Sequence, residues 1–129
     1  DLATGLTLDW LSRLSFKTCP KPRAVTRFQL ARDLLLQYGG MFEEIEKRRI
    51  DRLGSRRSVE KAFSETINMG PVEYSRILRL NNAREKICNE TFAEASIGDI
   101  AAEEGFWDWS RFSSYYRKQF GELPSHARR

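Results

Sequence analysis

The sequence is poor in cysteine and histidine, the residues from which most metal sites and many nucleophilic sites are built. Its two cysteines, Cys19 and Cys88, stand alone, without CxxC or any other metal-ligand spacing. The single histidine, His126, lies near the end of the chain, and no Ser/His/Asp or Cys/His arrangement can be assembled around it. We therefore expect no metal, no catalytic residue, and free thiols in a reducing compartment.

Other signals of enzymes are also missing. The carboxylate pairs Glu43–Glu44 and Glu103–Glu104 are adjacent in sequence, so the members of each pair do not share a helix face, and both pairs fit a solvated surface better than acid–base catalysis. The eight glycines form no phosphate-cradling loop. The sequence predicts a protein that is not an enzyme and needs no cofactor.

Long apolar runs and a signal peptide are absent as well. No stretch approaches the roughly 18 consecutive apolar residues of a membrane span, and the first residues do not resemble a secretory leader. We expect no membrane association and a cytoplasmic location. The first residue is Asp1 rather than Met, which suggests a piece of a longer chain.

Proline and alternating strand patterns are scarce, and helical periodicity recurs, which together predict an all-α protein. The chain breaks at TCPKP (residues 18–22), at Gly39–Gly40 and at Gly54–Ser55. Pro71 stands where the first residue of a helix is expected. The helical segments are residues 6–16, 23–38, 42–53, 56–67, 71–88, 96–104 and 109–119, and LPSHARR adds a last turn.

The sequence carries a weak internal repeat at an offset of 53 residues, which places residues 53–71 on residues 106–124. No gap is needed, and apolar residues, helix caps and prolines coincide. The pairs are Leu53 with Phe106, Ser55 with Asp108, Val59 with Phe112, Ala62 with Tyr115, Phe63 with Tyr116, Ile67 with Phe120, and Pro71 with Pro124. Upstream the match fails, because Ile100 and Ala101 would fall on Lys47 and Arg48.

Each copy ends in an amphipathic helix. At 100° per residue the polar residues share about a third of the circumference, opposite the aromatic or apolar ones. The polar set is Ser110, Ser113, Ser114 and Arg117 in the second copy, and Arg57, Glu60, Lys61 and Ser64 in the first. A merely solvated face would look the same, but the duplication favours two surfaces that are presented to a partner.

The second copy has the pattern of a helix-turn-helix motif. Apolar Ile97, Ile100 and Ala101 lie on one face of the first helix, Gly105 ends it, Phe106 fills the turn, and Asp108 caps the next helix. A helix presented in this way fits the DNA major groove. Serine hydroxyls can bond several base edges, and arginine can reach guanine or phosphate.

Charge is distributed in agreement with this reading. The chain has 22 Lys and Arg against 18 Asp and Glu, a net charge of +4, which permits an anionic partner without requiring one. Residues 46–61 contain seven basic and three acidic residues, and residues 108–129 contain five and two. Residues 89–105 contain five acidic residues and no Lys or Arg. Positive charge is thus concentrated around the two presumed recognition helices.

The two tryptophans beside Asp108 need separate interpretations. We expect Trp107 to pack against the domain. For Trp109 the alternatives stay open: its indole packs on the domain or touches the sensory part of a longer chain, or it stacks on a sugar or contacts a thymine methyl group.

The stretch IGDIAAEEGFWDWSRFSSYYRKQFGELPSHAR, beginning at Ile97, resembles the signature of the AraC/XylS family of transcription regulators, with Tyr116 in place of the usual phenylalanine. RILRLNNAR (residues 76–84) resembles that family's linker helix, and SRRSVEKAFSETINMGPVEYSRILRL its first recognition helix and the entry to the linker. The resemblance covers roughly residues 42–129. The family pattern has a glycine in the turn of the first helix-turn-helix, and in this sequence that glycine is displaced to Gly54. We therefore expect the first unit to be irregular, shifted in register or short of residues.

This resemblance implies two helix-turn-helix subdomains of homeodomain-like type joined by a long linker helix. The subdomains would be residues 23–70 and 90–129, the linker 71–89, and residues 1–22 an N-terminal helical tether or the remnant of a preceding domain. The implied function is that of a sequence-specific transcription regulator, and the resemblance implies an activator. Its recognition helices, about residues 56–66 and 109–119, would enter successive major grooves of promoter DNA.

The resemblance also implies the DNA-binding residues: Arg56, Arg57, Glu60, Lys61 and Ser64 in the first unit, and Trp109, Ser110, Arg111, Ser113, Ser114, Arg117 and Lys118 in the second. Arg117 and Lys118 fit phosphate contacts. Further partners left open are RNA polymerase, and a small-molecule effector or dimerisation through an N-terminal domain outside these residues. The alternative function is a non-catalytic adaptor with vestigial DNA binding, which Glu60 on a recognition helix mildly favours.

Overall fold

A computed structural model describes residues 22–128, with side chains from Arg23 onward. The expected helix at residues 6–16, the tether at residues 1–22 and Cys19 lie outside the described residues or at their edge. Within the described part every regular element is helical, which confirms the all-α prediction. None of these helices is both long and apolar enough to cross a membrane.

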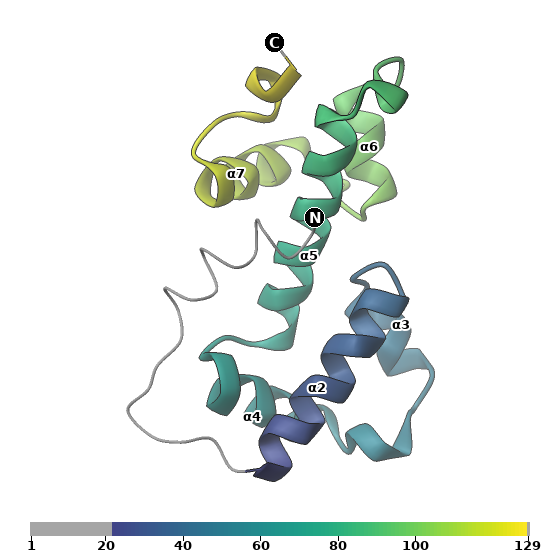
Figure 1. Ribbon diagram of the computed structural model, residues 1–129, viewed down its shortest axis with the longest axis vertical. Coiled ribbons are helices and arrows are strands. Elements are labelled where there is room, and N and C mark those ends of the chain that lie inside the picture. Colours follow the sequence, from purple (N-terminus) through teal and green to yellow (C-terminus); the bar gives the residue numbers. More distant parts are fainter. Residues whose placement is uncertain (1–21, 129) are drawn as a thin grey trace. The chain divides into compact units, whose positions relative to one another are not determined.

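The described elements follow one another as six α-helices and three short 3₁₀ turns (Figure 1). They are α2 (Pro22–Gln37), α3 (Phe42–Lys47), η1 (Asp51–Leu53), α4 (Arg56–Ile67), α5 (Pro71–Cys88), η2 (Glu90–Phe92), α6 (Ile97–Glu103), α7 (Trp109–Phe120) and η3 (Pro124–Arg128). The chain divides into two compact units, with the boundary inside α5 between Arg76 and Ile77.

The N-terminal unit, up to Arg76, is built around an aromatic cluster. Phe28 of α2, Phe63 of α4 and Tyr74 of α5 meet edge to face, with ring centroids 5.0 to 6.0 Å apart. Edge-to-face pairs of this kind add to the free energy that burial alone supplies. The cluster packs α2 along α4, so that one face of α4 is held against the core and the other faces outward.

One predicted helix of the N-terminal unit is wrong in extent. The charged segment 42–53 was expected to be one helix, but α3 ends at Lys47, and the chain then passes through Arg49, whose φ is +46°, into η1. Buried Ile45 and Leu53 lie on either side of this break and both enter the core. The break therefore lets two short elements bury their apolar residues where one straight helix would continue past the core.

The C-terminal unit, from Ile77, has a second core whose centre is the apolar side of α7. Phe112 and Tyr116 are fully buried against Leu80, Ala83 and Ile87 of α5 and against α6. At the chain end, the Arg128 guanidinium donates three hydrogen bonds, to the carbonyl oxygens of Ile87, Ala95 and Phe92. These bonds fix η3 and with it the far end of α7.

An ion pair positions α6 on α5 in the same unit. Lys86 of α5 lies 3.0 Å from the carboxylate of buried Glu104 and 3.4 Å from that of Glu103. The hydrogen bond to Glu104 raises the pKa of Lys86, because it stabilises the ammonium form. The acidic end of α6 is thus held by a cation of the neighbouring helix.

Candidate nucleic-acid interface

Helix α7 begins and ends at well-defined caps. The Asp108 carboxylate accepts a hydrogen bond from the backbone N–H of Arg111 at 3.2 Å, as an N-cap residue should. At the other end Gly121 adopts the left-handed conformation at φ +79°, and its N–H bonds the Arg117 carbonyl. Both ends are therefore encoded locally, and α7 has a defined length of twelve residues.

The polar side of α7 is presented to solvent as a group. Phe112 and Tyr116 point into the core, and the opposite face carries the predicted contacts. Ser113, Ser114, Arg117 and Lys118 line one shallow hollow of about 480 Å³ together with Leu123. Neither Arg117 nor Lys118 takes part in an ion pair within residues 22–128. The hollow thus offers two unneutralised cations and two hydroxyls at one place.

The approach to α7 is a tight turn after α6. Ser96 caps α6 by accepting a bond from the Asp99 N–H at 3.0 Å. The chain then turns at Gly105, at φ +86°, and the Phe106 ring enters the core 5.1 Å from the Phe112 ring. Gly105 is needed because this backbone conformation is costly for residues with a side chain. The turn and its aromatic plug orient α7 relative to α6.

The expectation for Trp107 is wrong. Its side chain is 84% exposed, because Phe106 already fills the apolar space under the turn and the next residue points outward. Trp109 is 50% exposed, with its ring centroid 5.8 Å from that of Phe112. The indole of Trp109 therefore packs partly on Phe112 and is partly open to solvent, which agrees both with packing on the domain and with a contact to a partner. Arg111 is exposed and lies 3.7 Å from the Asp108 carboxylate.

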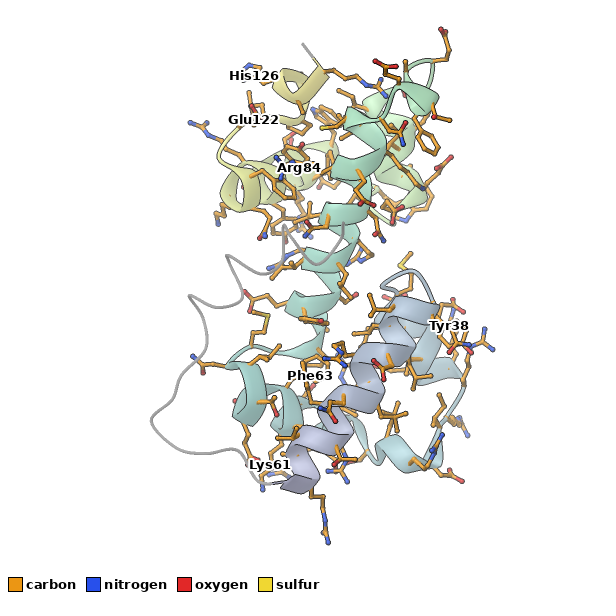
Figure 2. All side chains as sticks on the ribbon, viewed as in Figure 1. Tyr38, Lys61, Phe63, Arg84, Glu122 and His126 are labelled. Atoms are coloured by element: carbon orange, nitrogen blue, oxygen red, sulfur yellow. The ribbon has the colours of Figure 1, made fainter. Side chains whose placement is uncertain are left out.

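Helix α4 repeats the design of α7 in the N-terminal unit. The Ser55 hydroxyl accepts a bond from the Ser58 N–H at 3.2 Å, and Asn68 ends the helix in the left-handed conformation. Phe63 lies between α2 and α4, whereas Lys61 lies on the outside (Figure 2). The predicted contact residues of this helix are all exposed: Arg56, Arg57, Glu60, Lys61 and Ser64.

Ion pairs reduce the positive charge on α4. Arg56 lies 2.9 Å from the Glu46 carboxylate and 3.1 Å from that of Glu60, and Lys61 lies 3.9 Å from Glu65. Arg57 has no ion pair among the described residues. On α4, therefore, Arg57 is the cation that lacks a carboxylate partner among the described residues, and Glu60 is already engaged by Arg56.

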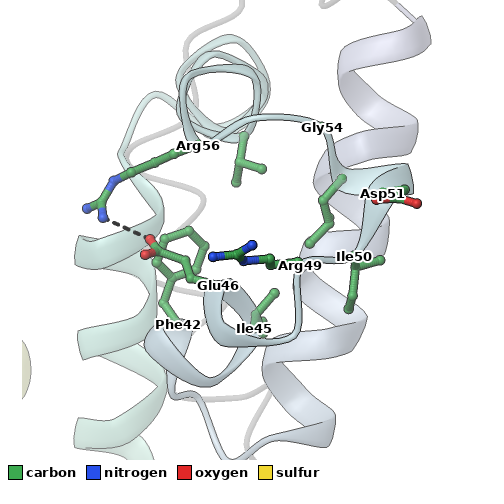
Figure 3. A pocket seen from close by; sticks show the side chains of 10 residues that line it. Phe42, Ile45, Glu46, Arg49, Ile50, Asp51, Gly54 and Arg56 are labelled. Carbon is green, nitrogen blue, oxygen red and sulfur yellow. Dashed lines mark ion pairs between the residues drawn. The ribbon is translucent and has the colours of Figure 1, made fainter.

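The first helix-turn-helix is irregular, and a cavity of about 500 Å³ accompanies the irregularity (Figure 3). The cavity has an apolar lining of Phe42, Ile45, Ile50, Leu53 and Val59, and a polar lining of Glu46, Arg49, Asp51 and Arg56. The Arg56–Glu46 ion pair closes one side of this cavity.

The fold and the site together define a helix-turn-helix protein with two exposed, capped helices, each opposite an apolar core. Residues 54–129, more than half of the chain, match a sequence-family model described as Helix-turn-helix domain. The chain belongs to this family, the AraC/XylS type of transcription regulator. Proteins of this family bind DNA and generally carry no catalytic activity.

Individual relatives agree with this assignment. The chain is 37% identical over 73 residues to the XylDLEGF operon transcriptional activator 2 of Pseudomonas putida, covering 57% of this chain and 46% of that protein. It is 38% identical over 74 residues to the HTH-type transcriptional regulator ArgR of Pseudomonas aeruginosa, covering 57% and 22%. It is 31% identical over 72 residues to the HTH-type transcriptional activator RhaS of Yersinia pestis, covering 56% and 25%.

The matched part is less than half of each of these relatives. No solved structure matches the chain at a significant level. Within the described residues no group of three His, Cys, Asp or Glu side chains is placed to hold a metal ion.

The structure groups the predicted site residues by unit. Four of the seven on α7 line one hollow, namely Ser113, Ser114, Arg117 and Lys118, whereas Trp109, Ser110 and Arg111 are exposed but do not line it. Those of α4 share its exposed face. Sequence reasoning missed Leu123, which lines the α7 hollow, and the arginines of α2. The arginines carried a usable signal, because Arg23 and Arg27 are four residues apart on a predicted helix and therefore share a face.

Proposed function

We propose that this chain binds double-stranded DNA sequence-specifically by inserting α7 and α4 into successive major grooves of a promoter. The polar face of α7 carries the proposal, because it presents Ser113, Ser114, Arg117 and Lys118 together, with no ion-pair partner for either cation within residues 22–128. Hydroxyls suit base edges, and unneutralised cations suit phosphates.

The caps add support to this assignment. A helix N-terminus exposes backbone N–H groups and carries partial positive charge, which favours an approaching phosphate. Asp108 satisfies one of these groups and leaves the others at the end of α7 that would enter the groove first. The same arrangement recurs at Ser55 on α4.

We extend the proposal to the whole protein, which would regulate transcription at the promoter that it binds. Relatives are named as activators of transcription, so we expect activation through contact with RNA polymerase. A domain that binds a small-molecule effector or dimerises would lie outside these 129 residues. The cytoplasm is the compartment in which a bacterial promoter is accessible.

The first prediction separates base reading from phosphate binding on α7. Replacing Ser113→Ala together with Ser114→Ala should change the preferred base at the contacted positions, because a good base contact contributes about 1–3 kcal/mol of discrimination. Arg117→Ala should weaken all sequences alike. The measurement is a randomised-site selection with each variant of this chain. Identical preference profiles for the double variant and the parent chain would contradict the assignment.

The adaptor function is the second candidate, and the exposed indole of Trp107 favours it. A protein partner would bury such a side chain readily. Salt dependence distinguishes the two functions, because DNA affinity falls by roughly 0.9 log units per log unit of salt for each phosphate neutralised. An adaptor would retain no duplex in a gel shift even at low salt.

A further inference from the structure

Three arginines of the N-terminal unit surround one hollow. Arg23 and Arg27 lie four residues apart on the same face of α2, and Arg52 comes from η1. With Thr26, Leu30 and Asp33 they line a space of about 550 Å³. The hollow therefore brings together three guanidinium groups and one carboxylate from two elements.

The carboxylate is engaged elsewhere. Asp33 lies 3.2 Å from the guanidinium of its neighbour Arg32. In contrast, Arg23, Arg27 and Arg52 have no ion pair within the part of the chain that the structure describes. With three guanidinium groups and one carboxylate that is already paired, the hollow has a local excess of positive charge.

Arg27 also has an unsatisfied hydrogen-bond donor. Its Nε atom is buried and finds no hydrogen-bond acceptor among the described residues. A buried donor without an acceptor costs free energy, and the turn at Gly54 lies against this atom. Since the side chain as a whole is half-buried and lines the hollow, its terminal nitrogens, and not Nε, would donate charge-assisted bonds to an oxyanion there.

Gly54 shapes the adjoining turn between η1 and α4. It has a φ of +77°, and a Cβ atom there would lie 3.3 Å from the Ser58 Cβ and 3.6 Å from the Arg27 Nε. The glycine therefore keeps the backbone of the turn close to the Arg27 guanidinium. This contact joins the arginine hollow to the beginning of α4.

A second, smaller hollow continues toward the recognition face of α4. It measures about 90 Å³, and its polar lining is Arg23, Arg27, Ser58, Lys61 and Glu65, of which Lys61 and Glu65 form an ion pair. Lys61 belongs to the face of α4 that is proposed to meet DNA. The two hollows share Arg23 and Arg27, so the basic strip formed by Arg52, Arg27 and Arg23 reaches from η1 along α2 toward α4.

We propose that Arg23, Arg27 and Arg52 bind phosphate groups of the DNA backbone that flanks the sequence read by α4. This inference rests on the proposed function. Guanidinium groups match phosphate oxygens in geometry and charge and can bind them through two parallel hydrogen bonds. A polyanion that already lies against α4 would extend along the strip, and successive phosphates would meet successive arginines.

The test is a series of equilibrium titrations of a selected duplex at increasing salt, with Arg27→Ala, Arg52→Ala and the Arg23→Ala/Arg27→Ala double variant. Each lost phosphate contact should lower the slope of log affinity against log salt by about 0.9, with sequence preference unchanged. Lys47→Ala is the control, because it removes one positive charge from the same unit at an exposed residue that is paired with Glu44 and lines neither hollow. Its slope should stay at the parent value.

A second arm shortens the duplex on the side of the α4 half-site. Removing the flanking base pairs should weaken the parent chain by more than Arg27→Ala does, because it removes the phosphates of all three arginines, and should weaken the Arg23→Ala/Arg27→Ala double variant by less. Urea unfolding of each variant accompanies the titrations. A salt slope that stays at the parent value for Arg27→Ala and Arg52→Ala would overturn the inference, whether or not the variants are less stable.

A free phosphate ion carries the same oxyanions as the DNA backbone. Inorganic phosphate is therefore used as a second probe of the arginine hollow. If it raises the melting temperature in an Arg27-dependent manner while the DNA slopes do not change, the hollow binds a free phosphate and the inference is wrong. If the slopes do not change but Ser113→Ala/Ser114→Ala alters sequence preference, the inference fails and the proposed function stands. If no duplex is bound by the parent chain, the proposed function fails.

Discussion

At the scale of single residues, Tyr116 places a polar hydroxyl group in the apolar core of the C-terminal unit. Its side chain is fully buried among aromatic rings, and its hydroxyl has no hydrogen-bond partner among the described residues. Burial raises the pKa of Tyr116 to about 12, because the phenolate would lose its hydration. The AraC/XylS pattern has phenylalanine here, which would make the same ring contacts without the hydroxyl.

We predict that Tyr116→Phe stabilises the chain by about 1 kcal/mol at neutral pH, because it removes an unsatisfied buried hydroxyl. Its effect should also depend on pH. The folded state holds the Tyr116 proton up to about pH 12, whereas the unfolded chain loses it near 10, so this residue lowers stability as pH rises between these values. Urea unfolding at neutral pH and above pH 10 measures both effects.

The control for this prediction is Tyr115→Phe, at a half-buried position of the same helix. An unfolding free energy for Tyr116→Phe that lies below the parent value at neutral pH would show that the hydroxyl has a stabilising partner.

Residue identity alone predicted part of this site. Apolar Phe112 and Tyr116 on one side, and Ser113, Ser114 and Arg117 on the other, follow from helix geometry, and the structure places them in this way. Trp107 was mispredicted, because a large apolar side chain suggests burial, and only the three-dimensional packing shows that Phe106 has taken the available space.

At the scale of elements, helix ends decide how well the sequence predicts the fold. Helices α4, α6 and α7 each begin at a capping side chain, Ser55, Ser96 or Asp108, that bonds the backbone three residues on. These signals are local, so the starts of the three helices were predictable to within a residue or so.

The end of helix α3, in contrast, was not predictable from the sequence. A helix end is usually marked by glycine in the left-handed conformation, but here Arg49 adopts it, at φ +46°. The Arg48 guanidinium lies 4.3 Å from the centre of the Tyr38 ring, which belongs to the turn after α2. Tertiary contacts of this kind end α3, and they leave no mark in the charged, helix-favouring sequence.

We predict that Ser55→Ala destabilises the N-terminal unit by about 1 kcal/mol, the usual cost of losing an N-cap hydroxyl. The loss should be local to α4, because the Ser55 hydroxyl bonds Ser58 only within that helix. Native-state hydrogen exchange of the first α4 amides measures it. Ser55→Asp should restore protection, since aspartate caps equally well, and failure of this rescue would assign the effect to something other than capping.

At the scale of the whole molecule, α5 is the element that belongs to both units. Tyr74 packs in the N-terminal core, and Leu80, Ala83 and Ile87 pack in the C-terminal core, while the helix itself is continuous from Pro71 to Cys88. The repeat predicted the two units by analogy between their capped helices.

The last prediction concerns the DNA site that such a chain would require. Eighteen helical residues form a rod of roughly 27 Å, comparable with the roughly 34 Å repeat of the major groove. If α5 holds α4 and α7 at a fixed separation, one chain should bind an asymmetric site of about two helical turns, because both recognition helices belong to the same molecule.

Inserting roughly five base pairs between the two half-sites turns one of them to the opposite side of the duplex. We expect affinity to fall to that of a single half-site, because a helix cannot bend to follow, whereas the same insertion outside the site should have no effect. Sedimentation of the complex at saturating protein should give one chain per site. A requirement for a palindrome, or tolerance of the insertion, would mean that the two units act on DNA from separate molecules or through a flexible link, and the assignment of α5 as a rigid linker would then be wrong.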